Sequence, residues 1–265
     1  LRGSIRKATA GWMSVAGVIL FAGVMGIHPA EANGRWYDAV FWSSFGNTLE
    51  FVVLSTPLIV AVGLAMALAL NGRGRSMGLF RTAFFASYVF SVSVLTLIWG
   101  YLLQPQRGIL AAFLSNFGVE PIPWLTNPNL AMPAIVMATL WWTVGFNMVL
   151  FLAGLQDIDP TLYEAAEIDG AGRLMQFQHI TLPGLQRTTL MVIVLQIIAS
   201  FQIFGQVYIM TRGGPGGSTR VLIQHIYESG FRDFELGYAS AMSLFLFAIM
   251  FVVSFFQFRL SPQEE

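Results

Sequence analysis

Long apolar runs without charge alternate along the sequence with short segments that carry the polar and charged residues. A charged side chain at the centre of a bilayer costs about 2.5 to 3.5 kcal/mol, so an uncharged apolar run of about 20 residues is typical of a membrane-spanning helix. Six runs contain neither Asp, Glu, Lys nor Arg, and they cover residues 10–27, 51–70, 83–103, 130–155, 188–210 and 236–258. The pattern predicts an all-α membrane protein with a single domain over residues 1–265, built as a polytopic bundle of six transmembrane helices.

The basic residues predict the orientation of these spans, because cytoplasmic loops are enriched in Lys and Arg. With the N-terminus inside, nine basic residues lie in the cytoplasm: Arg2, Arg6, Lys7, Arg73, Arg75, Arg81, Arg173, Arg187 and Arg259. Five lie outside: Arg35, Arg107, Arg212, Arg220 and Arg232. We therefore expect both termini, and the connecting loop over residues 156–187, to be cytoplasmic.

Residues 1–32 leave two interpretations open. Basic residues, an apolar stretch and Ala30-Glu31-Ala32 also resemble a secretory signal followed by its cleavage site. The apolar run is long for the hydrophobic part of a signal, which favours a first span over residues 10–27. Cleavage would leave the orientation of the other five spans unchanged.

Composition excludes several other classes of protein. Hydrophobic residues make up 55% of the chain and charged residues 11%, as expected for a membrane protein. The chain has no cysteine, and its three histidines are widely separated, so neither disulfides nor a metal site are predicted. Its basic residues form no tail or stripe, so no nucleic-acid partner is expected. No span carries a Ser/His, paired-Asp or HExxH arrangement typical of an intramembrane enzyme.

The loop over residues 156–187 contains an unusual concentration of acids: Glu164, Glu167 and Asp169 lie within six residues of this charge-poor chain. Thr161 and Glu164 have the spacing of a capping box, which predicts a short helix that begins there. A glycine favours helix termination, so we expect the helix to end at Gly170 and a second helical segment to follow. The prediction is a cytoplasmic helix, a bend and another helix.

The same loop resembles a known family signature. It matches the EAA signature of the permease subunits of ABC importers. The matching positions are Glu164-Ala165-Ala166, then Gly170 after three residues, Ile180 after nine more, and Leu182-Pro183 after one more. The resemblance extends over about residues 40–260 and is strongest to the carbohydrate-uptake, maltose-type branch. The segments that carry it are Asn47 to Leu49, Gly63 to Asn71, Phe80-Arg81, Trp99, Trp124-Leu125, Leu162-Tyr163, Thr211 to Thr219 and Phe231 to Ala239. The chain departs from the family at Ser87 and Ser91, where prolines are frequent.

The resemblance implies a type I ABC importer permease fold in the plasma (inner) membrane of a bacterium or archaeon. It implies that a second permease pairs with this chain, that two cytoplasmic ATPase subunits bind it, and that an external solute-binding protein delivers a sugar. The EAA loop would provide the coupling helix for the ATPase, through Glu164, Ala165, Ala166, Asp169, Gly170, Ile180, Leu182 and Pro183. No GxxxxGK[ST] motif occurs in the chain, so ATP and Mg are expected in the partner ATPase and no cofactor is expected here.

Polar residues inside two of the spans have two interpretations. The candidates are Thr139, Trp142, Thr143, Phe146, Asn147, Gln196, Ala199, Ser200 and Gln202. The resemblance implies that the family's sugar contacts align with all of these except Asn147 and Gln202. Hydroxyls and amides within spans either join helices by hydrogen bonds or face a water-filled path. Aromatic rings beside amides and hydroxyls would suit a sugar, so both interpretations stay open.

Three further hypotheses compete with a sugar permease. An importer for glycerol phosphates or polyamines would require charged residues in the path, and the spans contain none. A membrane scaffold would show no solute-dependent ATP turnover. Glu50, at the edge of the second predicted span, is a weak candidate for an ion relay. The glycine-rich segment from Gly213 to Gly217 is expected to be a flexible external loop, and the resemblance implies that it meets the binding protein.

Overall fold

The computed structural model describes residues 38–72 and 74–260, with side chains placed up to residue 255, and this part of the chain contains helices and no strands. The predicted first span over residues 10–27 and its alternative as a signal lie outside these residues. The helices are α2 (Ala39–Ala69), α3 (Arg75–Val89), α4 (Val92–Leu102), α5 (Ile109–Ser115), α6 (Pro128–Gln156), α7 (Pro160–Ile168), α8 (Arg173–Gln176), η1 (Phe177–Thr181), α9 (Leu182–Gly184), α10 (Gln186–Phe201), α11 (Gly205–Met210), α12 (Leu222–Tyr227), η2 (Glu228–Arg232) and α13 (Leu236–Leu260).

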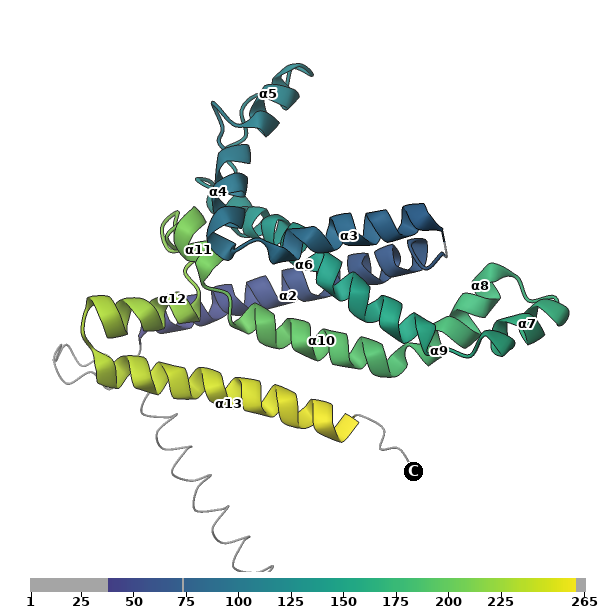
Figure 1. The fold of residues 1–265 in the computed structure, drawn as a ribbon. Helices are drawn as coiled ribbons and strands as arrows, with labels where there is room; N and C mark the ends of the chain where they lie inside the picture. Colours follow the sequence, from purple (N-terminus) through teal and green to yellow (C-terminus); the bar gives the residue numbers. More distant parts are fainter. Residues whose placement is uncertain (1–37, 73, 261–265) are drawn as a thin grey trace, which may run out of the picture.

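The long helices form an elongated bundle (Figure 1). Helix α2 contacts both α6 and α10, and α10 also contacts α13. The short helices α7 and α8 extend from one end of the bundle, and α4 and α5 project sideways from it. Among the described residues, α2, α6 and α13 are each long and apolar enough to cross a membrane, and two bent helix pairs raise the number of candidate spans to as many as five.

Helices α6 and α13 lie where the fourth and sixth spans were predicted, and their limits are within two residues of 130–155 and 236–258. The second span is longer than predicted: α2 begins at Ala39, where the Asp38 carboxylate accepts hydrogen bonds from the backbone N–H groups of Val40 and Phe41. Glu50 therefore lies within a helix, on its exposed side, and not at a helix edge.

The third predicted span, residues 83–103, is not one straight helix. Helix α3 begins earlier, at Arg75, and α4 departs from it at an angle of 99° after a break at Phe90 and Ser91. Backbone groups freed inside a membrane need partners within the protein. Trp142 on α6 donates its indole N–H to the Phe90 carbonyl at 3.1 Å, and the Ser91 hydroxyl accepts from the Val94 N–H at 3.4 Å. These two contacts accommodate the bend without a proline.

The fifth predicted span, residues 188–210, is also interrupted. Helix α10 ends at Phe201, and α11 begins at Gly205 after a short non-helical link. Before α10, the chain bends by 64° between the 173–184 segment and α10. The spanning helix is thus connected through an angle to the loop that precedes it.

Small residues allow the helices to approach closely. A Cβ atom added at Gly145 on α6 would lie 2.2 Å from the Phe84 carbonyl oxygen of α3, and one added at Gly154 would lie 2.4 Å from the Thr188 hydroxyl oxygen. Helices in membranes associate through such contacts, because lipid supplies no hydrophobic force between them. The path of α3 along α6 therefore depends on a glycine at position 145.

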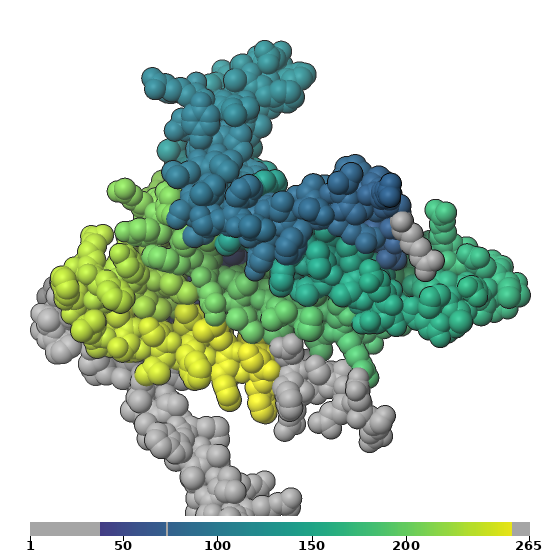
Figure 2. Space-filling model, viewed as in Figure 1, coloured from purple at the N-terminus to yellow at the C-terminus, as the bar shows by residue number. Residues whose placement is uncertain are grey.

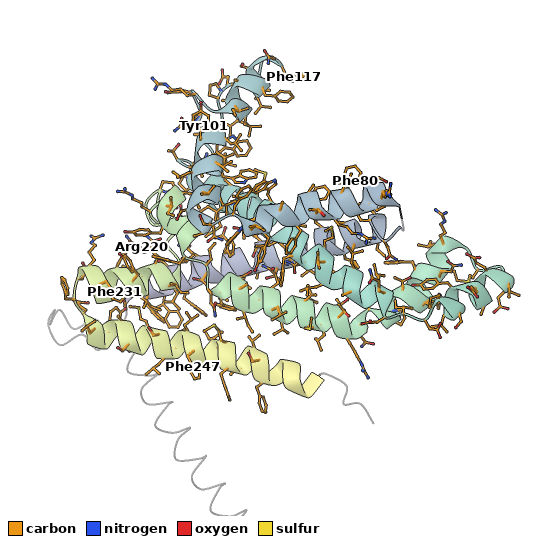
Figure 3. All side chains as sticks on the ribbon, viewed as in Figure 1. Phe80, Tyr101, Phe117, Arg220, Phe231 and Phe247 are labelled. Atoms are coloured by element: carbon orange, nitrogen blue, oxygen red, sulfur yellow. The ribbon has the colours of Figure 1, made fainter. Side chains whose placement is uncertain are left out.

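The outer surface is largely apolar. The space-filling view shows α4 and α5 as an arm that stands out from the body (Figure 2). Phe80 on α3, Phe117 after α5 and Phe247 on α13 are 53%, 70% and 59% exposed (Figure 3). Exposed aromatic side chains of this number are expected where a chain meets lipid or other apolar partners.

We expect the Gly145→Ala variant to be less stable than the wild-type protein, because the new methyl group meets a backbone atom that cannot rotate away. Overpacking of this kind costs about 1 to 3 kcal/mol. The midpoint of thermal unfolding in detergent measures the effect. Gly46→Ala on α2 is the matched control, since no atom lies within 4 Å of its added Cβ. Equal midpoints for the two variants would contradict the close contact of α3 with α6.

Candidate functional site

The acidic loop begins with helix α7, and its cap differs from the predicted one. The capping box of Thr161 and Glu164 is wrong: the N-cap is Asp159, whose carboxylate accepts the Thr161 N–H at 2.9 Å. Pro160 occupies the first helical position, where its missing N–H is not needed, so the helix starts before Thr161. The hydrogen bonds from the backbone and side chain of Thr161 hold the pKa of Asp159 below its ordinary value.

The end of α7 confirms the prediction for Gly170. Gly170 has φ +75°, a left-handed conformation that favours glycine, and it directly follows the C-cap residue Asp169. The Ala171 N–H donates to the Ala166 carbonyl at 2.8 Å, which closes the helix. The second helical segment also follows as expected, as α8, η1 and α9.

Helix α7 and the η1–α9 segment face each other as the two arms of a hairpin. The Tyr163 and Thr181 hydroxyl groups are 2.9 Å apart and join the arms. Tyr163 and Ile180 pack against a buried core formed by α2, α6 and α10. The base of the hairpin is therefore attached to the spanning helices.

The predicted coupling residues occupy different parts of this hairpin. Glu164, Ala165, Asp169 and Gly170 are exposed on α7 and its end, whereas Ala166 is half-buried. Ile180 is half-buried, and Leu182 and Pro183 are exposed on the second arm. The outer surface of α7 thus presents carboxylates beside a small residue, where another protein can approach closely.

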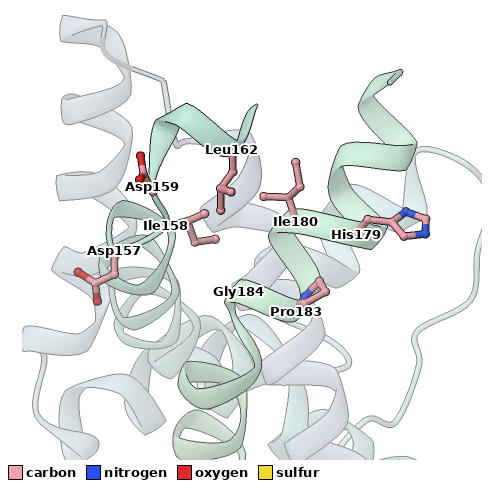
Figure 4. Close-up of a pocket in the computed structure, with 8 residues that line it drawn as sticks. All are labelled: Asp157, Ile158, Asp159, Leu162, His179, Ile180, Pro183 and Gly184. Atoms are coloured by element: carbon pink, nitrogen blue, oxygen red, sulfur yellow. The ribbon is translucent and has the colours of Figure 1, made fainter. Parts of the chain in front are cut away.

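A cavity of about 420 Å³ lies between the two arms. Ile158, Leu162 and Ile180 point into the gap from facing sides, and the Asp159 carboxylate lies at its edge (Figure 4). Asp157 and His179 also line the gap, so its apolar side chains are accompanied by two acids and a histidine.

The polar side chains of α6 and α10 form one buried hydrogen-bonded chain. Asn147 donates its side-chain amide to Gln196 Oε1 at 3.2 Å, and Gln196 donates to the Ser200 hydroxyl at 3.1 Å. The Ser200 hydroxyl in turn lies 3.1 Å from that of Ser55 on α2. These contacts join α2, α6 and α10. In this structure, Asn147, Gln196 and Ser200 therefore take the helix-joining arrangement.

The other predicted path residues are arranged differently. The hydroxyls of Thr139 and Thr143 donate to backbone carbonyls one turn earlier on α6. Ala199 is exposed, and Gln202 lies near α13, with its amide 3.5 Å from the Met250 sulfur. The structure does not bring Gln202 into the buried chain.

An aromatic cluster lies beside the bend between α3 and α4, and sequence reasoning missed one of its members. The Tyr88 ring stacks on Phe146 with centroids 4.8 Å apart and lies 6.0 Å from Trp142. Trp142 and Phe146 are half-buried and Tyr88 is 38% exposed. Nothing in the sequence singles out one tyrosine in an apolar run, because only the folded chain places it against α6.

The glycine-rich segment was expected to be flexible, but it forms an ordered loop with many hydrogen bonds. The Thr219 hydroxyl donates to the Gly214 carbonyl and also lies 2.7 Å from the Thr211 hydroxyl. Asn47 on α2 donates its amide to the carbonyls of Gly217 and Arg220 at 2.8 and 2.9 Å. Positive φ angles at Gly213, Gly216 and Gly217 permit this tight turn. The loop is therefore fixed to the N-terminal third of α2.

Within the part of the chain that the structure describes, no group of three or more His, Cys, Asp or Glu side chains is positioned to hold a metal ion. This part of the molecule thus offers a protruding acidic hairpin, an aromatic surface and buried polar contacts between helices.

Comparison with known proteins identifies related chains. Residues 59–264 match the family described as "Binding-protein-dependent transport system inner membrane component". The lactose transport system permease protein LacF of Rhizobium radiobacter is 36% identical over 236 residues, which are 87% of this chain and 79% of that protein. The trehalose/maltose transport system permease protein MalF of Thermococcus litoralis is 35% identical over 216 residues, 80% of this chain and 72% of that protein.

The fold also resembles that of a solved structure. A chain in the crystal structure of a bacterial alginate ABC transporter, in complex with a periplasmic protein that holds an alginate pentasaccharide, aligns with a TM-score of 0.80. The alignment covers 99% of this chain and 94% of that chain at 22% sequence identity. At this identity the likeness establishes the fold.

We expect Asn147 and Gln196 to be energetically coupled. Asn147→Leu or Gln196→Leu alone leaves a buried amide without its partner, whereas the double variant removes both amides. The loss in free energy of unfolding of the double variant should therefore be smaller than the sum of the losses of the two single variants. Hydrogen bonds between membrane helices contribute about 0.6 to 1.7 kcal/mol, which sets the coupling energy expected. Unfolding of the four proteins in detergent and denaturant measures it.

The control for this cycle pairs Gln196→Leu with Thr96→Val. Thr96 is buried, but its hydroxyl bonds only to carbonyls of its own helix. The losses in free energy of unfolding caused by these two substitutions should add. If the losses caused by Asn147→Leu and Gln196→Leu also add, the hydrogen bond between α6 and α10 is ruled out.

Proposed function

The chain belongs to the family of binding-protein-dependent transport system inner membrane components, and we propose that it forms, with a second permease, the translocation path of an ATP-driven sugar importer. Members of this family are multi-pass proteins of the inner membrane and are not themselves enzymes. The observation that carries the proposal is the EAA signature on an exposed helical hairpin that is attached at its base to three spanning helices.

In this proposal, α7 is the coupling helix that binds a cytoplasmic ATPase subunit. Glu164 pairs with a basic residue of the ATPase, while Ala165 and Ala166 allow close approach. Gly170 supplies the turn that directs the chain into the second arm. The exposure of Glu164 and the left-handed conformation of Gly170 support these roles. Asp169, Ile180, Leu182 and Pro183 complete the surface that the signature defines.

Two copies of the ATPase would bind ATP and Mg and hydrolyse the nucleotide. Closure of the two copies would move the hairpins of the two permeases. This chain would bind no nucleotide itself. In the proposed orientation both termini are cytoplasmic, and the loop held by Asn47 faces the external binding protein.

A neutral sugar is the cargo that the residues favour. The relatives LacF and MalF are named for lactose and for trehalose and maltose, and none of the residues proposed to line the path carries a charge that would attract a phosphate or a polyamine. Tyr88, Trp142 and Phe146 offer aromatic faces against which the apolar faces of a sugar ring can stack. Thr139, Thr143, Asn147, Gln196, Ala199, Ser200 and Gln202 are the proposed lining of the rest of the path.

The experiment that tests the proposal is gentle purification of the tagged chain from its native membrane, followed by identification of the proteins that accompany it. A second permease and an ATPase should be recovered, and ATP hydrolysis should rise with the binding protein and one sugar of a panel. Recovery of the chain without a stoichiometric ATPase would contradict the proposal and favour a scaffold.

We expect Glu164→Arg to abolish recovery of the ATPase, because it places a positive charge against the basic residue that Glu164 is proposed to bind. Recovery of the second permease should be unchanged. Glu120→Arg, an exposed acid in the loop on the opposite side, is the control and should retain both partners. If Glu164→Arg retains the ATPase and its sugar-dependent turnover, α7 is not the docking element.

Tyr88→Ala should weaken the response to the sugar without affecting assembly. The loss of one stacking ring corresponds to a rise on the order of two- to tenfold in the sugar concentration that half-saturates ATP hydrolysis. The measurement uses the purified complex reconstituted in proteoliposomes. Phe80→Ala is the control, because Phe80 is an exposed aromatic residue on the same helix. An unchanged or equally changed response in both variants would exclude the aromatic cluster from the path.

A further inference from the structure

Helices α4 and α5 and the links around α5, residues 92–127, form a lateral arm that stands out from the side of the bundle (Figures 1 and 2). Helix α4 leaves α3 at an angle of 99°, so it runs across the direction of the long helices. One side of α4 packs against α11, and α5 packs on α4. The lateral arm is thus supported by the bundle only at its base.

The free side of α4 is an apolar stripe. It consists of Val94, Leu97, Ile98 and Tyr101, which follow the i, i+3, i+4, i+7 spacing of one helical face and are 40% to 68% exposed. Leu95 is buried on the other side, and α4 contains no charged residue. A helix that is apolar on all sides is typical of a position that is covered on all sides. The stripe on α4 therefore requires a cover.

Helix α5 requires a cover even more strongly. None of its residues is buried, and all except the last are apolar, so apolar side chains surround the helix. Ile109 and Phe113 are 59% and 58% exposed on adjacent turns. An isolated helix shorter than about 12 residues is marginal in water, and α5 has seven residues. Packing on α4 alone leaves most of its surface free.

Neither water nor lipid is a suitable cover for the whole lateral arm. A helix at the membrane surface needs a charged or polar face towards water, and neither α4 nor α5 contains a charged residue. In the bilayer interior, irregular backbone is tolerated only where protein covers it or where it lines a water-filled cavity. The links around α5 are irregular and carry Arg107 and Glu120. A protein partner meets both requirements.

The base of the lateral arm offers a place for a partner side chain. A cavity of about 540 Å³ lies between α4 and α11, where Leu97, Gly100 and Tyr101 line it from α4 and Ile209 and Met210 from α11. A Cβ atom added at Gly100 would have no atom within 4 Å, so the cavity is open above this glycine. Small residues allow membrane helices to approach closely, and anchor side chains of interfaces fill such pockets.

We propose that the lateral arm packs against the second permease, and that an apolar side chain of that permease fills the cavity beside Gly100. The inference rests on the pairing in the proposed function and assigns a surface to it. The direction of the lateral arm selects this partner. It extends sideways from the long helices, so it reaches a neighbour in the plane of the membrane, whereas the hairpin of α7 and α8 extends from one end of the bundle (Figure 1).

The test is photo-crosslinking in native membranes, with p-benzoylphenylalanine in place of Leu97. The expected product is a covalent adduct of this chain with the second permease, either a homologous chain or a second copy, identified by mass spectrometry. The same probe in place of Phe247 is the control. Phe247 is 59% exposed on α13, which lies on the side of the bundle away from the lateral arm (Figure 1), and should give no such adduct.

Four results from the Leu97 probe would overturn the proposal: adducts with lipid alone, an adduct within this chain, an adduct with the ATPase or the binding protein, or the same permease adduct as from Phe247. If the second permease is recovered with the chain but gives no adduct, the lateral arm is not the interface and the proposed function stands. If no second permease is recovered at all, the pairing itself is wrong.

A glycine substitution tests the cavity separately. Gly100→Leu fills the cavity and should raise about tenfold the protein concentration at which the second permease dissociates on dilution in detergent. Gly78→Leu on α3 is the matched control, because a Cβ atom added there also has no atom within 4 Å, and it should dissociate as the wild type does. Equal dissociation of the two variants would overturn the insertion of a partner side chain.

Discussion

Backbone N–H and C=O groups inside a bilayer have no water to bind, and every break in a spanning helix must supply partners for the groups that it frees. Side chains from neighbouring elements supply such partners at the bend between α3 and α4 and at the end of α2. The Trp142 indole binds the Phe90 carbonyl at the bend between α3 and α4. Arg81 donates to the carbonyls of Leu70 and Gly72, so it satisfies the end of α2 in the same way. The bend between α3 and α4 is therefore a property of the packed bundle.

This constraint explains which parts of the fold could be predicted from the sequence. Helices α6 and α13 contain their own hydrogen bonds, and their limits follow from the length of an uncharged run. The breaks after Val89 and Phe201 interrupt runs that are as apolar as the others, and the first of them depends on a tryptophan more than 50 residues away. Composition within one segment carries no information on such a partner. Tyr88 was missed for the same reason: it belongs to the aromatic cluster only because α3 lies along α6.

The hairpin was predicted more fully because its geometry is local. Gly170 adopts the left-handed conformation that ends α7, and the signature residues around it lie on adjacent turns. The error concerned one residue of the cap. Proline at position 160 starts the helix before Thr161, and Asp159 then has the position from which its carboxylate reaches the Thr161 N–H. A capping box and a proline compete for the same turn, and the fixed φ of proline decides the outcome here.

The buried polar chain would have to open before a solute could pass along the proposed path, which a permanently open channel would not require. Asn147, Gln196 and Ser200 bind one another, so they can reach a solute only after these hydrogen bonds open. Breaking these hydrogen bonds costs free energy unless each buried polar group gains a new partner. Sugar hydroxyls can serve as such partners, because they both donate and accept hydrogen bonds. The hairpin is positioned to influence this exchange, because Tyr163 and Ile180 pack on the core that α10 shares with α2 and α6. A displacement of the hairpin by an ATPase would move the start of α10, and α10 carries both Gln196 and Ser200. In the proposed function, the coupling of ATP hydrolysis to transport would then require α10 to transmit a movement over the roughly 15 Å that separate residues ten apart on an α-helix.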